Sequence, residues 1–481
     1  MFVIKKRLLA LLAASVFVFS GLPGVVTGED GFDAEFYKKA SELSDLTQVS
    51  GEIESEPQDE YILGQLIVRT KNGQRLKNTR GAIGEVRRSD GLYLLQYSDS
   101  EAAKQAQALL DSEDMVEYAA PNALFRLDST QTELDAAVYP DNFPYCWGKD
   151  RIKADILGSY ISNVKREVIV AVIDSGADID HPFFAGRLVE GYNALDGSND
   201  VTDLTDPSLG VFNSHGTHVA GIILNCTPEN VKVMPIKAFG ADVGSTLDVI
   251  AGIDYAAANG ANVINMSLGA DISEVPEASK PVEDAVTRAV SRNITVVASA
   301  GNSGEDIKNY IPARYDNVIT VTAIHQNGTF ASFSNYGSAV DLCAPGVYIW
   351  SSVVGGGYDT KSGTSMASPF IAAAAAMVLS ENPEYSPQIV KSKLQSVADP
   401  LGDAVYYGAG LIDLEKYKDI LFEERSEFRK QNVTVILLIR DYILGQAQLT
   451  PAEKTEYDYN NDGIINIFDM ITLRNIILRR G

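Results

Sequence analysis

Short apolar runs alternate with amphipathic segments between about residues 138 and 417. The runs are rich in β-branched residues and do not alternate with polar ones; they cover 168–173, 231–239, 262–268, 294–300 and 318–324. Strands of this kind lie in parallel sheets that are covered on both faces. Between the runs lie segments with helical periodicity, for example 246–260 and 282–293. The pattern predicts a doubly wound α/β domain, with functional residues just beyond the carboxyl ends of its strands.

A smaller unit precedes this domain, over residues 61–127. Its predicted elements are two strands, a helix and a final extended segment, at 65–70, 92–97, 101–112 and 116–127. They predict a separate α+β module. Residues 29–60 are polar and acidic and predict a mobile lead-in, and residues 128–137 predict an exposed linker.

The pattern over residues 1–28 predicts a secretory signal peptide. Basic residues at 5–7 precede an apolar segment at 8–19, and Val26 and Gly28 stand before the expected cut. The apolar segment is shorter than the roughly 18 residues of a membrane span. We therefore expect a secreted, extracellular protein with no membrane span after signal removal. A retained N-terminal anchor is the alternative.

Composition narrows the class of partner. The 481-residue chain has a net charge of −24 and no evident basic cluster, so no nucleic acid partner is expected. Three cysteines exclude a disulfide scaffold. Cys226 and Cys343 have apolar neighbours and are expected to be buried thiols, whereas Cys146 could be exposed.

Three polar residues stand at the ends of predicted elements. Asp174 follows a buried strand, and His215 and Ser365 begin helices. Each alone would be a turn or helix-capping residue. In the order Asp, His, Ser they match a catalytic triad, in which a carboxylate orients the base and the base activates the serine hydroxyl. His218 would suit a metal site with His215, but no third ligand is suggested, so it is expected to pack within its helix.

The residues around these positions resemble the subtilase family of serine proteases. Three motifs carry the resemblance, which extends over about 147–414: "DSG" at 174–176, "HGTHVAG" at 215–221 and "GTSMASP" at 363–369. It implies a subtilisin-like fold with Asp174, His215 and Ser365 as the triad. It also implies that Asn302, within "ASAGNSG", stabilises the oxyanion.

The same resemblance implies a peptide-binding cleft. Its substrate-binding residues are expected in two short segments, Ser267, Leu268 and Gly269 on one side and Ser299, Ala300 and Gly301 on the other. The floor of the primary pocket maps near Asn309 and Tyr310. If Tyr310 projects inward, the pocket is shallow and favours small side chains.

The module at 61–127 resembles the ferredoxin-like propeptide of this family. That implies an intramolecular inhibitor, removed by self-cleavage between about 126 and 137. After the histidine motif the chain lacks the calcium-binding loop of many family members, and no such site is expected there. An acidic loop might bind calcium instead, although a solvated loop is the preferred interpretation; its residues are Asp196, Asp200, Asp203 and Asp206.

Residues 424–481 carry a separate signal. Oxygen-bearing ligands stand at the spacing of a calcium loop, with Gly463 at its sharp turn: Asp458, Asn460, Asp462, Ile464 through its backbone carbonyl, Asn466 and Asp469. With similar helices at 435–445 and 469–480, the segment resembles a small all-α type I dockerin. The resemblance implies one Ca²⁺, because the upstream copy keeps only Asn432, and a cohesin domain as partner. Ile467 and Phe468 are the candidate contacts, and a segment that only stabilises the C-terminus is the alternative.

These features predict a secreted serine endopeptidase that hydrolyses peptide bonds of extracellular proteins. It would be made as a self-processing zymogen and docked to a cohesin-bearing scaffold, as in a cellulosome, with no organic cofactor. The alternative is a catalytically silent subtilase-like, peptide-binding scaffold component, against which the complete triad argues. A hydrolase of simple esters is a third hypothesis, weakened by the peptide-binding segment at 267–269.

Overall fold

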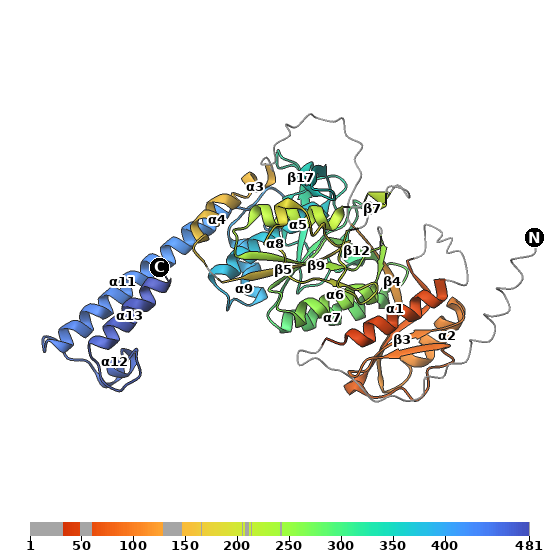
Figure 1. The fold of residues 1–481 in the computed structure, drawn as a ribbon, viewed down its shortest axis with the longest axis horizontal. Coiled ribbons are helices and arrows are strands. Elements are labelled where there is room, and N and C mark those ends of the chain that lie inside the picture. The colour runs from red at the N-terminus through yellow and green to blue at the C-terminus, as the bar shows by residue number, and fades with distance from the viewer. Residues whose placement is uncertain are drawn as a thin grey trace, which may run out of the picture.

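The computed structural model describes residues 32–48, 60–127, 147–164, 166–203, 205–206, 211–212, 214–240 and 243–480. The predicted signal peptide, the linker at 128–137 and Cys146 lie outside these residues. Figure 1 shows a small N-terminal unit, a central α/β domain and a helical C-terminal extension.

A nine-stranded sheet forms the centre of the α/β domain. Its strands, in spatial order, are β19 (Ala398–Asp399), β20 (Leu411–Ile412), β16 (Leu342–Pro345), β15 (Ile319–Ile324), β13 (Thr295–Ser299), β11 (Val263–Met266), β5 (Val168–Asp174), β9 (Val231–Lys237) and β6 (Tyr192–Asn193). Neighbouring strands pair in parallel, except β19 with β20. The five apolar runs are β5, β9, β11, β13 and β15, so the predicted parallel sheet is confirmed.

Helices cover both faces of this sheet. One face is covered by α5 (His215–Cys226) and α8 (Thr364–Glu381), among others, and the other by α6 (Thr246–Ala258) and α7 (Ser279–Ser291) (Figure 1). Strand β5 shows why its sequence is apolar at consecutive positions. Val170 and Val172 pack into the hydrophobic core on the face covered by α5 and α8. Ala171 and Ile173 pack into the core on the opposite face, covered by α6 and α7.

Helix α8 runs through the core of the domain. Of the helices that the structure describes, it alone has the length and hydropathy to cross a membrane, and 94% of that segment is buried inside the domain. The alanine-rich sequence is therefore that of a core helix packed closely on all sides. Ser365 is its second residue, so the core fixes the position of this serine.

The N-terminal unit contains the predicted strands and helix. Its elements are β1 (Tyr61–Thr70), β2 (Gly84–Arg87), β3 (Leu92–Gln96), α2 (Ser100–Asp111) and β4 (Val116–Leu127). The strands pair antiparallel in the order β4-β1-β3-β2, and α2 packs against β1 and β4. The predicted α+β module is present, with one short strand, β2, that the sequence pattern did not reveal.

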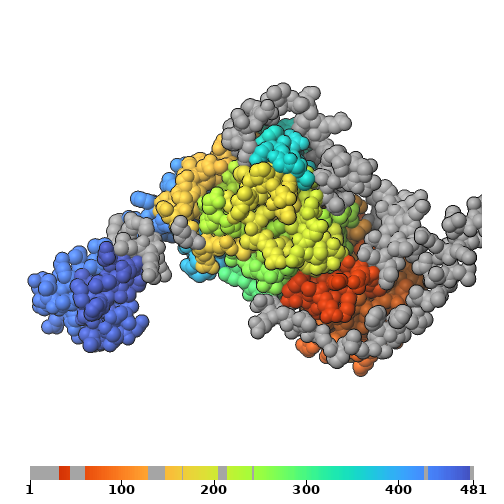
Figure 2. Space-filling model, viewed as in Figure 1, coloured from red at the N-terminus to blue at the C-terminus, as the bar shows by residue number. Residues whose placement is uncertain are grey.

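Helix α1 (Ala34–Gln48) corrects the interpretation of residues 29–60 as a mobile lead-in. Phe36 and Tyr37 are each 2% exposed, and Ala40 is fully buried. These residues lie on one face of the helix. Figure 2 shows α1, in red, at the junction of the N-terminal unit and the α/β domain. The polar composition of the segment concealed this apolar face.

The C-terminal extension consists of three helices, α11 (Leu414–Ile443), α12 (Pro451–Glu456) and α13 (Ile467–Arg480). Helix α11 continues through residues 417–424, so no break marks the expected domain boundary there. Helix α13 packs back along α11, with Ile439 and Leu473 buried between them (Figure 1). Asn432 lies inside α11, so the upstream copy is a continuous helix rather than a loop–helix unit.

Candidate active site

Asp174 and His215 meet at the carboxyl end of β5. Asp174 is the last residue of β5, and His215 is the first residue of α5. His215 Nδ1 donates to Asp174 Oδ1 at 2.7 Å, and both side chains are fully buried. Because Nδ1 carries the proton of the neutral ring, Nε2 keeps a lone pair, and it has no hydrogen-bond partner among the described residues. This geometry presents Nε2 as a base.

Two contacts hold the start of α5 against the end of β5. An ideal Cβ on Gly216 would lie 2.1 Å from the Gly176 carbonyl oxygen, so only glycine allows this close approach. The buried Asp203 carboxylate accepts from the Thr217 amide at 3.1 Å and from the Thr217 hydroxyl at 2.7 Å. Burial raises the pKa of Asp203. This member of the acidic loop is therefore a buried anchor of α5, and the expectation of a solvated residue is wrong for it.

Ser365 lies at the same edge of the sheet. Its Oγ donates to the Ser267 carbonyl oxygen at 2.9 Å, and the Ser267 hydroxyl donates to the Ser365 carbonyl oxygen at 2.9 Å. At the N-terminus of a helix, the first amide groups have no intrahelical acceptor. The fold thus brings the predicted nucleophile and base to one place, but Ser365 Oγ is turned toward Ser267 rather than His215.

Asn302 is fixed beside the start of α8. Its Oδ1 accepts from the Thr364 amide at 2.9 Å and from the Thr364 hydroxyl at 3.0 Å. The amide nitrogen of Asn302, the donor of that side chain, therefore lies on the side away from Thr364. Sequence reasoning missed the role of Thr364, whose only signal was its place within "GTSMASP".

The predicted peptide-binding segment pairs with a strand of the chain itself. Strand β12 (Leu268–Asp271) lies antiparallel to β4, with Leu268 opposite Leu127 and Gly269 opposite Arg126. On its other edge, β4 pairs antiparallel with β10 (Val243–Ser245). The sequence pattern did not reveal β10. Strand β4 therefore occupies a cleft between two edges that bind an extended chain.

The second predicted segment follows β13. Ser299 and Ala300 are fully buried, and the Gly301 amide donates to the Thr364 hydroxyl at 3.1 Å. Both predicted segments therefore contact the first residues of α8, next to Ser365.

Two further histidines are held by backbone groups. His218 Nε2 donates to the carbonyl oxygens of Ile349 and Asp359 at 2.9 and 3.2 Å. Burial lowers the pKa of His218 well below its ordinary value, so the ring is neutral. His181 donates to the Gly357 carbonyl oxygen at 3.0 Å. These contacts agree with the packing role expected for His218 and give His181 a structural role as well.

Both cysteines within the described part of the chain are buried thiols, as predicted. Cys226 lies in α5 and Cys343 in β16, and neither forms a disulfide. Burial raises the pKa of Cys343 to about 12, so this thiol stays protonated at neutral pH and does not act as a nucleophile.

Residues 458–469 form a hydrogen-bonded loop before α13. Its carboxylates accept from backbone amides: Asp458 from Asp462 and Gly463, Asp462 from Ile464, and Asp469 from Asn460 and Asn466. Gly463 has φ of 80°, which suits the sharp turn expected there. No three His, Cys, Asp or Glu side chains of the described residues gather as a metal site. The loop's fit to a cation therefore depends also on amide and carbonyl oxygens.

The parallel sheet places the chain in the α/β class, and a buried Asp–His pair is also part of the catalytic arrangement of serine peptidases. The model of the subtilase family, Peptidase S8, matches residues 165–410, and the chain belongs to this family. It is a subtilisin-like serine endopeptidase with the predicted subtilisin-like fold.

Two Bacillus proteases agree with this assignment. The chain is 34% identical over 373 residues to a thermophilic serine proteinase of Bacillus sp. (strain AK1). The matched region covers 73% of this chain and 86% of that protein. It is 39% identical over 285 residues to subtilisin DY of Bacillus licheniformis, covering 56% and 97% of the two chains. A solved structure of a cold-adapted subtilisin-like serine proteinase matches with 35% identity and a TM-score of 0.47, over 56% of this chain and 96% of the other.

Proposed function

We propose that Ser365, His215 and Asp174 form the catalytic triad of a secreted endopeptidase that is made as a self-processing zymogen. The observation that carries the proposal is the 2.7 Å hydrogen bond between His215 and Asp174, which fixes the imidazole with its Nε2 lone pair free to accept a proton. Casein hydrolysis by the processed chain, and its loss on substitution of Ser365, tests the assignment.

The first chemical step is acyl transfer to serine. Rotation about the Cα–Cβ bond of Ser365 turns Oγ from the Ser267 carbonyl toward His215 Nε2, since a serine hydroxyl has three staggered positions. Nε2 then takes the hydroxyl proton as Oγ attacks the peptide carbonyl, and Asp174 stabilises the resulting imidazolium.

The oxyanion formed in this step needs hydrogen-bond donors. The Asn302 amide group and the backbone N–H of Ser365, the second residue of α8, are the donors in this proposal. Thr364 holds the Asn302 side chain in place through its amide and hydroxyl. Donors that are fixed before the reaction stabilise the transition state without reorganisation.

Residues 61–127 act in this proposal as the inhibitory propeptide. Their last strand, β4, lies antiparallel between β10 and β12, the arrangement in which an extended peptide adds to a sheet edge. The unit also caps a helix of the catalytic domain, because Asn122 Oδ1 accepts from the Leu247 amide in the first turn of α6 at 3.2 Å. Cleavage in the linker at 128–137 would convert this covalent strand into a dissociable inhibitor.

Helix α1 extends the inhibitory unit beyond the predicted start at residue 61. A cluster of buried polar groups joins α1 to both neighbouring parts. Asp254 Oδ2 accepts from the Tyr37 hydroxyl at 2.6 Å and from Arg88 Nη1 at 2.6 Å, and Arg288 donates to Asp254 Oδ1 at 2.9 Å. Burial alone would raise the pKa of Asp254, but the charges of Arg288 and Arg88 outweigh it and lower the pKa. The carboxylate therefore stays charged and binds all three donors.

Replacing Tyr37 with alanine in the full chain is expected to shorten the retention of the cleaved N-terminal fragment at least tenfold. The substitution removes a buried ring and leaves Asp254 with one donor fewer. It therefore weakens the contact of α1 with the catalytic domain, while the pairing of β4 with β10 and β12 remains. The measurement follows fragment dissociation by size-exclusion chromatography, together with the lag before peptide hydrolysis reaches a steady rate.

Lys39→Ala is the matched control, because Lys39 lies on the same helix and its ion pair within the described residues is with the exposed Glu35. It should release the fragment at the wild-type rate, and all proteins should reach the same final activity. If Tyr37→Ala and the wild type retain the cleaved fragment equally long, α1 is not part of the inhibitory unit. If the alanine variant does not fold, Tyr37→Phe, which removes only the hydroxyl, should shift the release in the same direction.

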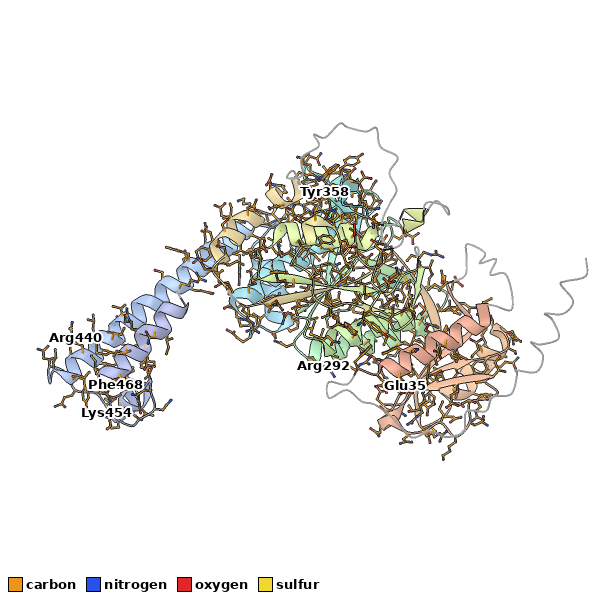
Figure 3. All side chains as sticks on the ribbon, in the orientation of Figure 1. Glu35, Arg292, Tyr358, Arg440, Lys454 and Phe468 are labelled. Carbon is orange, nitrogen blue, oxygen red and sulfur yellow. The ribbon has the colours of Figure 1, made fainter. Side chains whose placement is uncertain are left out.

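The loop at 458–469 is our proposed calcium site, and the C-terminal extension our proposed dockerin-like module. The oxygen donors of Asp458, Asp462 and Asp469, with their neighbouring amides, are those that calcium prefers. When bound, the ion would crosslink the two ends of the loop and hold the start of α13. The apolar side chains of Ile467 and Phe468, near the end of this loop, are 53% and 61% exposed. Figure 3 labels Phe468 on this part of the C-terminal extension. They would supply the contact with a cohesin domain.

Calcium titration of the inactive Ser365→Ala full chain is expected to show one binding event that Asp458→Ala removes. Glu456→Ala, an exposed acid just before the loop, should bind as the parent does. Titration with a type I cohesin should give a complex in calcium but none after chelation. Calcium binding that is unchanged by Asp458→Ala would exclude this loop as the site.

A further inference from the structure

The Tyr310 ring lies between the two segments that border the cleft. Gly269 belongs to the β12 side, and Gly301 belongs to the side that follows β13. An ideal Cβ built on Gly269 would lie 2.2 Å from Tyr310 Cε1, and one built on Gly301 would lie 2.6 Å from the same atom. The absence of a side chain at both positions is therefore what admits the ring.

Backbone pairing fixes Tyr310 in this place. It begins β14 (Tyr310–Ile311), which pairs antiparallel with β12 and sets Tyr310 opposite Asp271. Residues that face each other in such a pair hold their side chains at a defined distance. Tyr310 is thus positioned by the same strand that binds β4 on its other edge.

Both segments next to the ring also contact the first residues of α8, where the proposed nucleophile lies. Ser267, directly before β12, accepts a hydrogen bond from Ser365 Oγ at 2.9 Å, and Gly301 donates to the neighbouring Thr364. In the proposed function the substrate backbone lies along β12 as β4 does, so a side chain beside the cleaved bond would enter the space between these segments. That space contains the Tyr310 ring.

We propose that Tyr310 closes the primary side-chain pocket, so that the enzyme cleaves after residues with small side chains, namely glycine, alanine and serine. The inference rests on the proposed triad, since it takes Ser365 as the point of attack. Protein interiors are close-packed, and a ring seated against two backbones leaves no room for a second large group without displacement.

A cavity of about 270 Å³ is lined in part by Tyr310 itself. Its other lining residues include Asp271, Glu305 and Asp306, against a single lysine, Lys308. Removing the ring would join this cavity to the cleft. The enlarged pocket would accept long side chains, and its excess of carboxylates would favour basic ones.

The test is a series of peptides that differ only in the residue before the cleaved bond, with glycine, alanine, leucine, phenylalanine, lysine or glutamate there. For the processed wild-type enzyme, kcat/KM for alanine should exceed that for phenylalanine at least tenfold. In Tyr310→Gly, the ratios of phenylalanine to alanine and of lysine to alanine should each rise at least tenfold, with lysine well above glutamate.

Two controls separate the pocket from general damage. Tyr310→Phe keeps the ring and should keep the wild-type order of substrates. Tyr336→Ala enlarges the same cavity, but the Tyr336 ring packs on Tyr406 rather than between the glycines, so its order should also be unchanged. Tyr310→Ala replaces the glycine variant if circular dichroism shows that the latter is unfolded.

A wild-type enzyme that prefers phenylalanine or leucine would overturn the inference, as would an unchanged order in Tyr310→Gly. Casein hydrolysis reports the proposed function separately. A wild type inactive on casein and on every peptide would overturn the triad, and the pocket assignment with it.

Discussion

Replacing Ser365 with alanine is expected to leave the chain of residues 29–481 uncut and to lower casein hydrolysis by about 10⁶-fold, the size known for this substitution in subtilisin. Without the hydroxyl, His215 has no nucleophile to activate, and only binding and oxyanion stabilisation remain. Intact mass spectrometry should show a single species for the variant. The wild type should show two fragments, divided within residues 128–137.

Ser368→Ala is the matched control for this experiment. Ser368 is a buried serine one turn further along α8, and its hydroxyl bonds to Ser267 rather than lying at the predicted point of attack. This variant should still divide in the linker. A Ser365→Ala chain that also divides there, in purified form, would show that another group or another protease makes the cut.

Replacing Asp174 with asparagine is expected to lower kcat by about 10⁴-fold with little change in KM, a size known from another serine protease family. The carboxylate accepts the Nδ1 proton of His215 at 2.7 Å. An amide can present its NH₂ group at that place, which favours the tautomer with the proton on Nε2, and Nε2 is then no longer a base. Steady-state kinetics on a peptide substrate separates the two constants.

The control for this prediction is Asp178→Asn. Asp178 lies four residues further along the same turn and accepts from the Gly355 amide at 2.9 Å, not from a histidine. We expect its activity to stay within a few-fold of wild type. A loss in Asp174→Asn that appears mainly in KM would indicate a substrate-binding role for this carboxylate.

The sequence predicted the parallel sheet and the edge at which the site lies, and both follow from local pattern. Runs that are apolar on both faces must be covered on both sides, and parallel strands end at one edge. Asp174 was therefore expected at that edge. Its meeting with His215, 41 positions away, was expected from the triad order and the family motifs, because His215 follows none of the five predicted strands.

Features created by packing across the fold were not predictable in this way. Strand β10 is three residues long and exists because it pairs with β4, and the anchoring of Asn302 by Thr364 joins groups 62 positions apart. Such contacts leave no periodic signal in the chain. Tyr310 was expected near the pocket floor, but only the two facing glycines reveal that its ring fills the space.

Helix α1 was missed because its partners lie elsewhere in the fold. Its segment is acidic overall, which favours disorder when taken alone. Phe32 stacks edge-on against both Tyr192 and Tyr255, and Tyr37 reaches Asp254. These partners come from two distant parts of the sequence, residue 192 and residues 254–255. Composition described the exposed face of the helix, whereas the fold determined what its other face meets.

The most direct test of the central claim is covalent labelling of the processed protein with an aryl sulfonyl fluoride. The reagent transfers its sulfonyl group to an activated serine oxygen and releases fluoride. We predict one adduct for each molecule, located on Ser365 by peptide mapping, with activity lost in proportion to labelling. His215→Ala, whose linker is cut by an added protease because this variant should not process itself, should not be labelled. Activity lost with Ser365 unmodified, or equal labelling in the His215 variant, would contradict the account.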